Sequence, residues 1–175
     1  MAFRSLQDLL IHELQDLHSV EQQLTEALPK MAKNAAHPEL RAAFEDHLGE
    51  TKGHLEQVGR LLESMDAKPG KVKCVAMAGI IKEGEETLKE DAPEAIKDAA
   101  IIGAAQRVEH YEIAVYGTVR AMAETIGESE VALALDKILA QEHAADERLT
   151  ELSETINKQA QAEAAAASPG ERRKR

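Results

Sequence analysis

Acidic residues interrupt the apolar faces of the predicted helices, and their spacing could hold metal ions. In residues 104–118, AAQRVEHYEIAVYGT, helical spacing places Glu109 on one stripe with Ala105 and Tyr116, and Glu112 lies at its edge. A carboxylate on an apolar face is costly unless its charge is compensated. Glu109 therefore predicts a compensating partner inside the fold.

The same pattern recurs on the other long predicted helices. Glu21 lies between Leu17 and Leu24, so it falls within the apolar stripe of its helix. Leu135 and Leu139 likewise share a face with acidic residues. The further polar residues on or beside inward faces are His47, Glu50, His54, Glu142 and Asp146.

Distance from the turns predicts that these carboxylates lie in matched layers. In an antiparallel helical hairpin, residues equally far from the turn lie at the same height, and each residue adds about 1.5 Å. With turns centred near residues 35–36 and 127–128, three pairs agree in height to within a few ångströms: Glu21 with Glu50, Glu112 with Glu142, and Glu109 with Asp146.

Carboxylates gathered in an apolar interior repel one another, and desolvation opposes their charge as well. They could stay protonated or pair with Lys or Arg, but the inward positions offer almost no basic side chains. The remaining solution is a pair of divalent or trivalent ions, for which iron and manganese accept hard oxygen ligands. The predicted metal ligands are Glu21, Glu50, His54, Glu109, Glu112, Glu142 and Asp146, with His47 as either a further ligand or a core histidine.

The elements that must position these residues are all helical. Ala, Glu, Leu, Lys and Gln dominate the chain and favour helices, and no segment shows sustained β-branched alternation. Two hairpins of long helices flank one long connection, which is typical of a crossover four-helix bundle. The predicted helices span about residues 3–33, 38–65, 74–90, 93–126 and 129–158.

The ends of the chain differ in character. Residues 1–158 form the predicted bundle domain, and residues 159–175 are low in complexity, with a fraying helical end followed by a basic, disordered tail. That tail could touch nucleic acid, but the net charge of −11, from 21 Lys and Arg against 32 Asp and Glu, disfavours phosphate binding by the folded part.

Composition narrows the cellular setting. The single cysteine, Cys74, excludes an intramolecular disulfide framework, and no apolar run reaches the roughly 20 residues of a membrane span. Nothing at the N-terminus resembles a signal peptide. We expect a cytoplasmic protein without a membrane partner.

Four stretches resemble the YciE/YciF family of ferritin-like bacterial proteins: AAQRVEHYEIAVYGT, CVAMAGIIKEG, LRAAFEDHLGETKGHLEQV and ELQDLHSVEQQLTEALPKM. The resemblance covers about residues 3–155. It implies a ferritin-like four-helix bundle with an additional helix, a homodimer, a role in stress responses and a rubrerythrin-like metal site. The metal ligands that it implies are Glu21, Glu50, Glu109, Glu112, Glu142 and Asp146.

Three functions remain open at this point. The first is a di-iron or di-manganese protein with redox chemistry on peroxide, oxygen or Fe(II), as in a peroxidase, catalase or ferroxidase, with an external electron donor. The second is a stress-induced binding or scaffold protein with a structural metal site. The third is DNA protection in the manner of mini-ferritins, against which the acidic charge argues. Tyr111 or Tyr116 could relay electrons or pack in the core.

Overall fold

Five helices make up nearly all of the described chain, which covers residues 3–71 and 73–167 of the computed structural model. No strand occurs within those residues, which confirms the all-α prediction. The helices are α1 (Leu6–Asn34), α2 (Pro38–Ser64), α3 (Val75–Thr87), α4 (Glu94–Ile126) and α5 (Ser129–Ala167).

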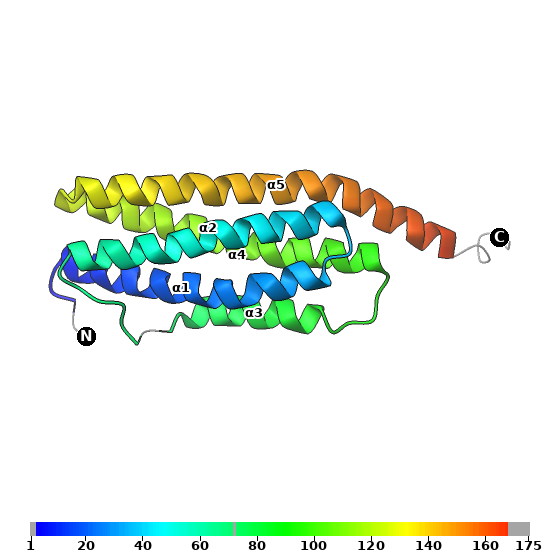
Figure 1. Ribbon diagram of the computed structural model, residues 1–175, viewed down its shortest axis with the longest axis horizontal. Coiled ribbons are helices and arrows are strands. Elements are labelled where there is room, and N and C mark those ends of the chain that lie inside the picture. Colours follow the sequence, from blue (N-terminus) through cyan, green and yellow to red (C-terminus); the bar gives the residue numbers. More distant parts are fainter. Residues whose placement is uncertain (1–2, 72, 168–175) are drawn as a thin grey trace.

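Four long helices form a bundle of two antiparallel hairpins, α1–α2 and α4–α5 (Figure 1). The hairpins also pack against each other, because α1 contacts α4 and α2 contacts α5. The long connection between α2 and α4 runs back along the bundle and carries α3, so the predicted crossover topology is confirmed.

Local sequence explains where the helices start and stop. Ser5 begins α1 with a capping box, in which its hydroxyl accepts from the Asp8 backbone N–H and the Asp8 carboxylate accepts from the Ser5 N–H. Pro38 occupies the first turn of α2, where its missing N–H costs nothing. Gly127 ends α4 with φ 86°, a left-handed conformation that favours glycine.

The last helix extends through the low-complexity segment. The predicted body of this helix ends at about residue 158, and α5 continues to Ala167, where the sequence predicts a fraying helical end. Their strong helix formers, Ala and Gln, favour this continuation. Ala160 is still buried, whereas residues 161–165 are exposed. The predicted basic tail at residues 168–175 lies outside the described residues.

A carboxylate from α4 holds the turn between α1 and α2. His37 precedes α2 without a capping side-chain hydrogen bond of its own. Instead, the backbone N–H groups of Ala36 and His37 donate to the two carboxylate oxygens of Asp98, at 2.9 and 2.8 Å. Asp98 is buried, and it supplies the negative charge that a helix N-terminus favours.

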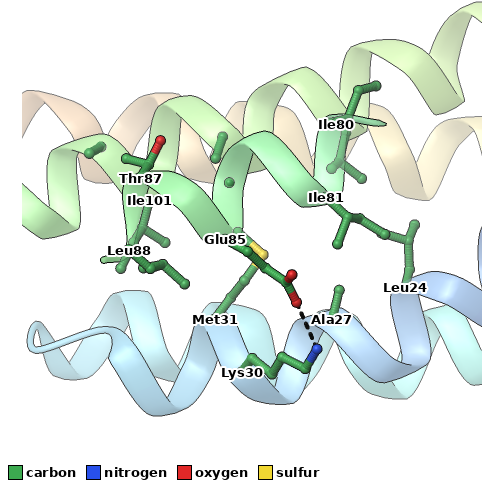
Figure 2. A pocket seen from close by; sticks show the side chains of 14 residues that line it. Leu24, Ala27, Lys30, Met31, Ile80, Ile81, Glu85, Thr87, Leu88 and Ile101 are labelled. Atoms are coloured by element: carbon green, nitrogen blue, oxygen red, sulfur yellow. Dashed lines mark hydrogen bonds and ion pairs between the residues drawn. The ribbon is translucent and has the colours of Figure 1, made fainter. Parts of the chain in front are cut away.

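The short helix α3 covers part of the bundle formed by α1 and α4. A narrow pocket beneath it is lined almost entirely by aliphatic side chains, among them Leu24, Met31 and Ile81 (Figure 2). An ion pair between Lys30 and Glu85, with 2.7 Å between Nζ and Oε1, crosses its rim.

The apolar core consists of two clusters, one towards each end of the bundle. One cluster contains Leu24 and Phe44, and the other contains Leu14 and Val58.

Among the described residues, no helix combines the length and apolar character that a membrane crossing requires.

Candidate metal centre

A polar layer separates the two apolar clusters, and every long helix contributes to it. On α2, the layer falls between Phe44 of one cluster and Val58 of the other. On α4 it falls between Val108 and Tyr116. Six buried side chains form the layer, with exposed fractions of 0% for Glu21 and Glu142, 1% for Glu112, 2% for Glu109, 3% for His54 and 6% for His47.

The first group of candidate ligands consists of His47, Glu109, Glu112 and Glu142. One ligand atom from each lies within 4.8 Å of the others. The Nε2 atom of His47 lies 3.5 Å from Glu109 Oε1 and 3.8 Å from Glu142 Oε2. These side chains come from α2, α4 and α5, so only the folded bundle assembles the group.

The second group consists of Glu21, His54 and Glu142, again with ligand atoms within 4.8 Å of one another. His54 Nδ1 lies 2.9 Å from Glu142 Oε1 and 3.9 Å from Glu21 Oε2. Glu142 belongs to both groups, so it is placed as a carboxylate that bridges two ions would be. The arrangement brings the sequence-predicted residues Glu21, His54, Glu109, Glu112 and Glu142 together, along with the alternative ligand His47.

Many polar atoms of this layer are buried without a hydrogen-bond partner. They include both carboxylate oxygens of Glu112 and of Glu142, one oxygen each of Glu21 and Glu109, and one ring nitrogen each of His47 and His54. His54 Nδ1 and Glu142 Oε1 lie 2.9 Å apart, but their relative orientation is not that of a hydrogen bond. Both atoms are therefore counted among those without a hydrogen-bond partner. Buried polar atoms without partners are rare in folded proteins and call for an explanation.

Burial makes the charged carboxylates unfavourable. Desolvation, followed by the charge of Glu142, raises the pKa of Glu21 to about 7. Desolvation raises the pKa of Glu109 to about 8, although the nearby His47 opposes this. Desolvation and three neighbouring carboxylates raise the pKa of Glu112 well above its usual range. Without a bound cation, the surroundings therefore favour the protonated, neutral form of these three carboxyls.

The two histidines respond to the same surroundings in the opposite sense. Burial alone would lower the pKa of His47, but the carboxylates of Glu50, Glu109 and Glu142 outweigh it and raise the pKa to about 9. The pKa of His54 is raised as well, because Glu142 and Glu21 outweigh the effect of burial.

The donor set fits two divalent metal ions. Four carboxylates and two imidazoles from four helices are the inventory of ferritin-like di-iron and di-manganese sites. In those sites each histidine follows a glutamate by three residues, whereas here both histidines lie on α2. Four carboxylates balance the charge of two divalent ions, and both groups place unpartnered atoms together.

Two predicted ligands lie at the edge of the layer rather than within it. Glu50 has 42% of its side chain exposed, and its Oε2 lies 3.4 Å from His47 Nδ1. That contact with His47 lowers the pKa of Glu50. Asp146 accepts from the side-chain amide of Gln106 at 3.3 Å and lies 3.5 Å from His110. Neither residue belongs to the two groups of candidate ligands.

Tyr116 and Gln141 hydrogen-bond to side chains of the layer, and the sequence did not predict these contacts. The hydroxyl of Tyr116 donates a short hydrogen bond to Glu21, so this tyrosine faces the candidate site. His54 Nε2 donates to Gln141 Oε1 at 3.1 Å, which leaves Nδ1 towards the carboxylates. Gln141 precedes Glu142, and the sequence offered no signal for its role.

Tyr111 lies beside the start of α3. Its hydroxyl is 3.0 Å from Cys74 Sγ and donates to Asp16 at 3.4 Å. Cys74 caps α3, because its sulfur accepts from the Met77 N–H. These contacts link the start of α3 to α1 and α4. Tyr111 therefore serves to pack these elements together.

Comparison with known proteins places the chain among bacterial relatives. The Escherichia coli protein YciF is 42% identical over 163 residues, which cover 92% of this chain and 98% of YciF. The crystal structure of the E. coli stress protein YciF matches with a TM-score of 0.86 over 89% of this chain and 99% of that one, at 41% identity.

Two further solved structures match. YcfI from Rhodopseudomonas palustris has a TM-score of 0.81 and 41% identity, over 84% of this chain and 94% of its own. A ferritin-like, diiron-carboxylate protein from Bacillus anthracis has a TM-score of 0.68 over 86% of this chain and 99% of its own. Because it is only 16% identical, it supports the ferritin-like fold alone.

The family comparison matches residues 5–162 to the domain of unknown function DUF892. This match covers α1 to α4 in full and most of α5. Together with the identity to YciF, it confirms the resemblance found in the sequence. The chain belongs to the DUF892 family, and it is similar in sequence and fold to E. coli YciF.

Proposed function

We propose that this protein is a di-metal carboxylate protein that binds two iron or manganese ions and carries out redox chemistry on peroxide, oxygen or Fe(II). The observation that carries the proposal is the buried layer of four glutamates and two histidines, whose ligand atoms converge without hydrogen-bond partners. When bound, such ions would each exchange one electron and so supply the redox chemistry.

The side chains of the layer have distinct proposed roles. His47, Glu109 and Glu112 would hold one ion, Glu21 and His54 would hold the other, and Glu142 would bind both. Gln141 orients His54 through its Nε2–H, and Tyr116 orients Glu21. Glu50 and Asp146, predicted as ligands from the sequence, are proposed to join the set only when their side chains rotate inward.

Proton release accompanies the proposed binding. Because burial raises the pKa values of Glu21, Glu109 and Glu112, these carboxyls hold protons near neutral pH when no metal is present. An ion must displace those protons, so uptake acidifies an unbuffered solution. The chain contains one cysteine and therefore no cysteine cluster for an iron–sulfur donor, so electrons must come from an external reductant.

Redox turnover by metal-loaded protein tests the proposal. Protein loaded anaerobically with Fe(II) or Mn(II) is mixed with hydrogen peroxide or oxygen, and oxidant consumption is followed by stopped flow. We expect consumption that exceeds that of free metal and is lost in Glu142→Ala. Protein that binds two ions but consumes oxidant no faster than Glu142→Ala would instead support a structural metal site in a binding or scaffold protein.

The cellular setting belongs to the same proposal. We propose a cytoplasmic homodimer that acts in stress responses, because the similar E. coli protein YciF is described as a stress protein. Sedimentation equilibrium measures the mass of the assembly, for which we expect twice that of the 19.1 kDa chain. A monomer at micromolar concentration would remove the dimer from the proposal.

A further inference from the structure

A groove between α2 and α5 leads from the surface to the buried layer. The two helices lie side by side in the bundle (Figure 1). Two neighbouring hollows lie along the groove, and both are lined by Asp46 and Glu50. These two residues are one helical turn apart on α2, so they occupy the middle of the groove.

The groove reaches residues of the candidate metal centre itself. One hollow is lined by His47 and Glu109, and the other is lined by His54. Glu109 is 2% exposed and His47 is 6% exposed, so the floor of the first hollow is a buried polar surface. Glu109 Oε2 and His47 Nε2 have no hydrogen-bond partner, which points to a ligand at this floor.

Small residues keep the groove open. Gly49 and Gly53 line one hollow, and Ala144 and Ala145 line the other. A Cβ atom added at either glycine would meet no atom within 4 Å. Glycine inside a helix costs about 1 kcal/mol relative to alanine, so two of them one turn apart on α2 need a reason beyond packing.

The groove is lined by the carboxylates of Asp46 and Glu50 along both hollows, by Arg148 in one hollow, and by Arg60 and Lys137 in the other. Arg148, at one end, lies near the carboxylates of Glu39 and Glu151, at 3.8 and 3.9 Å. Arg60, at the other end, lies 3.7 Å from Glu56 and hydrogen-bonds Gln57. Among the described residues, Asp46 engages in no ion pair, and Glu50 forms an ion pair only with His47.

The apolar pocket beneath α3 offers no comparable route. Its lining is aliphatic except for Thr87 and the paired Lys30 and Glu85 at the rim (Figure 2). A hydrated divalent ion would lose its water there without gaining oxygen ligands, which is strongly unfavourable. The groove between α2 and α5 is therefore the better path for an ion.

We infer that divalent cations reach the buried layer through the α2–α5 groove, with Asp46 as the first docking site and Glu50 as the carboxylate that passes them inward. Glu50 would exchange its contact with His47 for the arriving ion. The inference rests on the proposed metal centre, but it concerns the rate of uptake, whereas the proposed function concerns the final stoichiometry.

The test measures uptake of Co(II), a divalent ion that is stable in air and absorbs visible light when bound by carboxylates and imidazoles. Stopped-flow absorbance gives the rate, and equilibrium titration gives the number of ions bound. The blocking variant is Gly53→Leu with Ala145→Leu, which fills both hollows. The matched control is Gly59→Leu with Ala140→Leu, on the same two helices but outside both hollows.

We expect the blocking variant to take up Co(II) about tenfold more slowly while still binding two ions, and the control pair to match the wild type. Equal rates in all three proteins would overturn the inference and leave the proposed function standing. Wild-type protein that binds no Co(II) at equilibrium would overturn both.

A surface variant keeps the test valid if the blocking variant does not fold. Asp46→Asn changes an exposed residue, so the fold should persist, as far-ultraviolet circular dichroism would confirm. We expect uptake about threefold slower at low ionic strength and a smaller difference at high salt, because screening weakens attraction between charges. An unchanged rate at low salt would argue against docking at Asp46.

Discussion

The central feature at the residue scale is a set of four buried glutamates that share one layer with two histidines. Glu112 is the clearest case, because both of its carboxylate oxygens are buried without a partner and its neighbours include three other glutamates. Apolar residues of similar volume would give a more stable bundle. The layer therefore costs stability in the metal-free protein, a cost that the proposed metal binding would offset.

The pKa shifts predict how the metal-free protein responds to pH. For Glu21, Glu109 and Glu112, the folded-state pKa lies above the usual carboxyl value, so the folded protein binds more protons and its stability falls as pH rises above about 4.5. For His47, with a pKa of about 9, the stabilisation is present below about pH 6.5 and lost as pH approaches 9.

Both effects have the same sign, so metal-free protein should lose stability steadily from pH 5 to pH 9. We expect a loss on the order of 3 kcal/mol, or a fall in Tm of about 6–12 °C. Differential scanning calorimetry in the presence of a chelator measures it. A Tm that is constant or rises over this range would contradict the account of the layer.

Replacing one acid with its neutral isostere should separate stability from binding. Glu112→Gln removes a buried carboxyl with a strongly raised pKa, so at pH 8 we expect the metal-free variant to gain about 1–3 kcal/mol in free energy of unfolding. The same variant should bind Mn(II) more weakly in calorimetric titration. Glu147→Gln, an exposed change on α5, is the control and should alter neither quantity.

At the element scale, the helices act as a frame that brings distant residues to one height. The α1–α2 turn and the start of α4 are fixed to each other by Asp98, since two backbone N–H groups before α2 donate to its carboxylate. This contact sets the register between the two hairpins at that end of the bundle. The register in turn places Glu109 and His47 in one layer.

Removing this contact should destabilise the whole bundle. Asp98→Ala leaves two partly buried N–H groups without an acceptor, and we expect a loss of about 2–4 kcal/mol in free energy of unfolding. Urea denaturation measures the loss. Glu94→Ala, at an exposed position in the first turn of α4, is the control; equal midpoints for the two variants would show that the Asp98 contact carries no stability.

Much of the fold could be predicted because its boundaries are marked by special residues. Pro38 begins α2 and Gly127 ends α4, each for a steric reason that is local to the residue. The sequence therefore places those two turns accurately. The end of α5 carries no such mark, and its Ala- and Gln-rich continuation remains helical to Ala167, beyond the predicted body of the helix. The cap from Asp98 depends on tertiary contact, which sequence spacing does not reveal.

The sequence predicted the level of the candidate ligands along the bundle better than the direction in which their side chains point. Helical rise placed Glu21, Glu109, Glu112 and Glu142 at compatible levels, and the structure brings them together. Glu50 lies at the right height but on the flank of α2, where its side chain is partly exposed beside His47. Asp146 accepts a hydrogen bond from the side-chain amide of Gln106 outside the two groups of candidate ligands. Spacing along a helix does not resolve such side-chain orientation.

At the scale of the whole molecule, two apolar clusters enclose the polar layer and stabilise it. The surface is strongly acidic, with a net charge of −11, so cations concentrate around the protein before they bind. The fold alone does not establish activity, and the argument for function depends on the layer itself.

Metal binding should stabilise the entire bundle, because the ligands come from four helices. At a free Mn(II) concentration one thousand times the Kd, we expect about 4 kcal/mol of added stability. Thermal unfolding with increasing Mn(II) measures this, and Glu142→Ala should show little increase because it lacks the shared carboxylate. An equal increase in both proteins would indicate binding elsewhere.

The most direct test of the central claim is anomalous scattering from crystals soaked anaerobically with Fe(II) or Mn(II), recorded above and below the metal edge. We predict two peaks in each chain, one among His47, Glu109, Glu112 and Glu142 and one among Glu21, His54 and Glu142. An ordered layer that shows no peak after soaking, or peaks only on the surface, would contradict the claim.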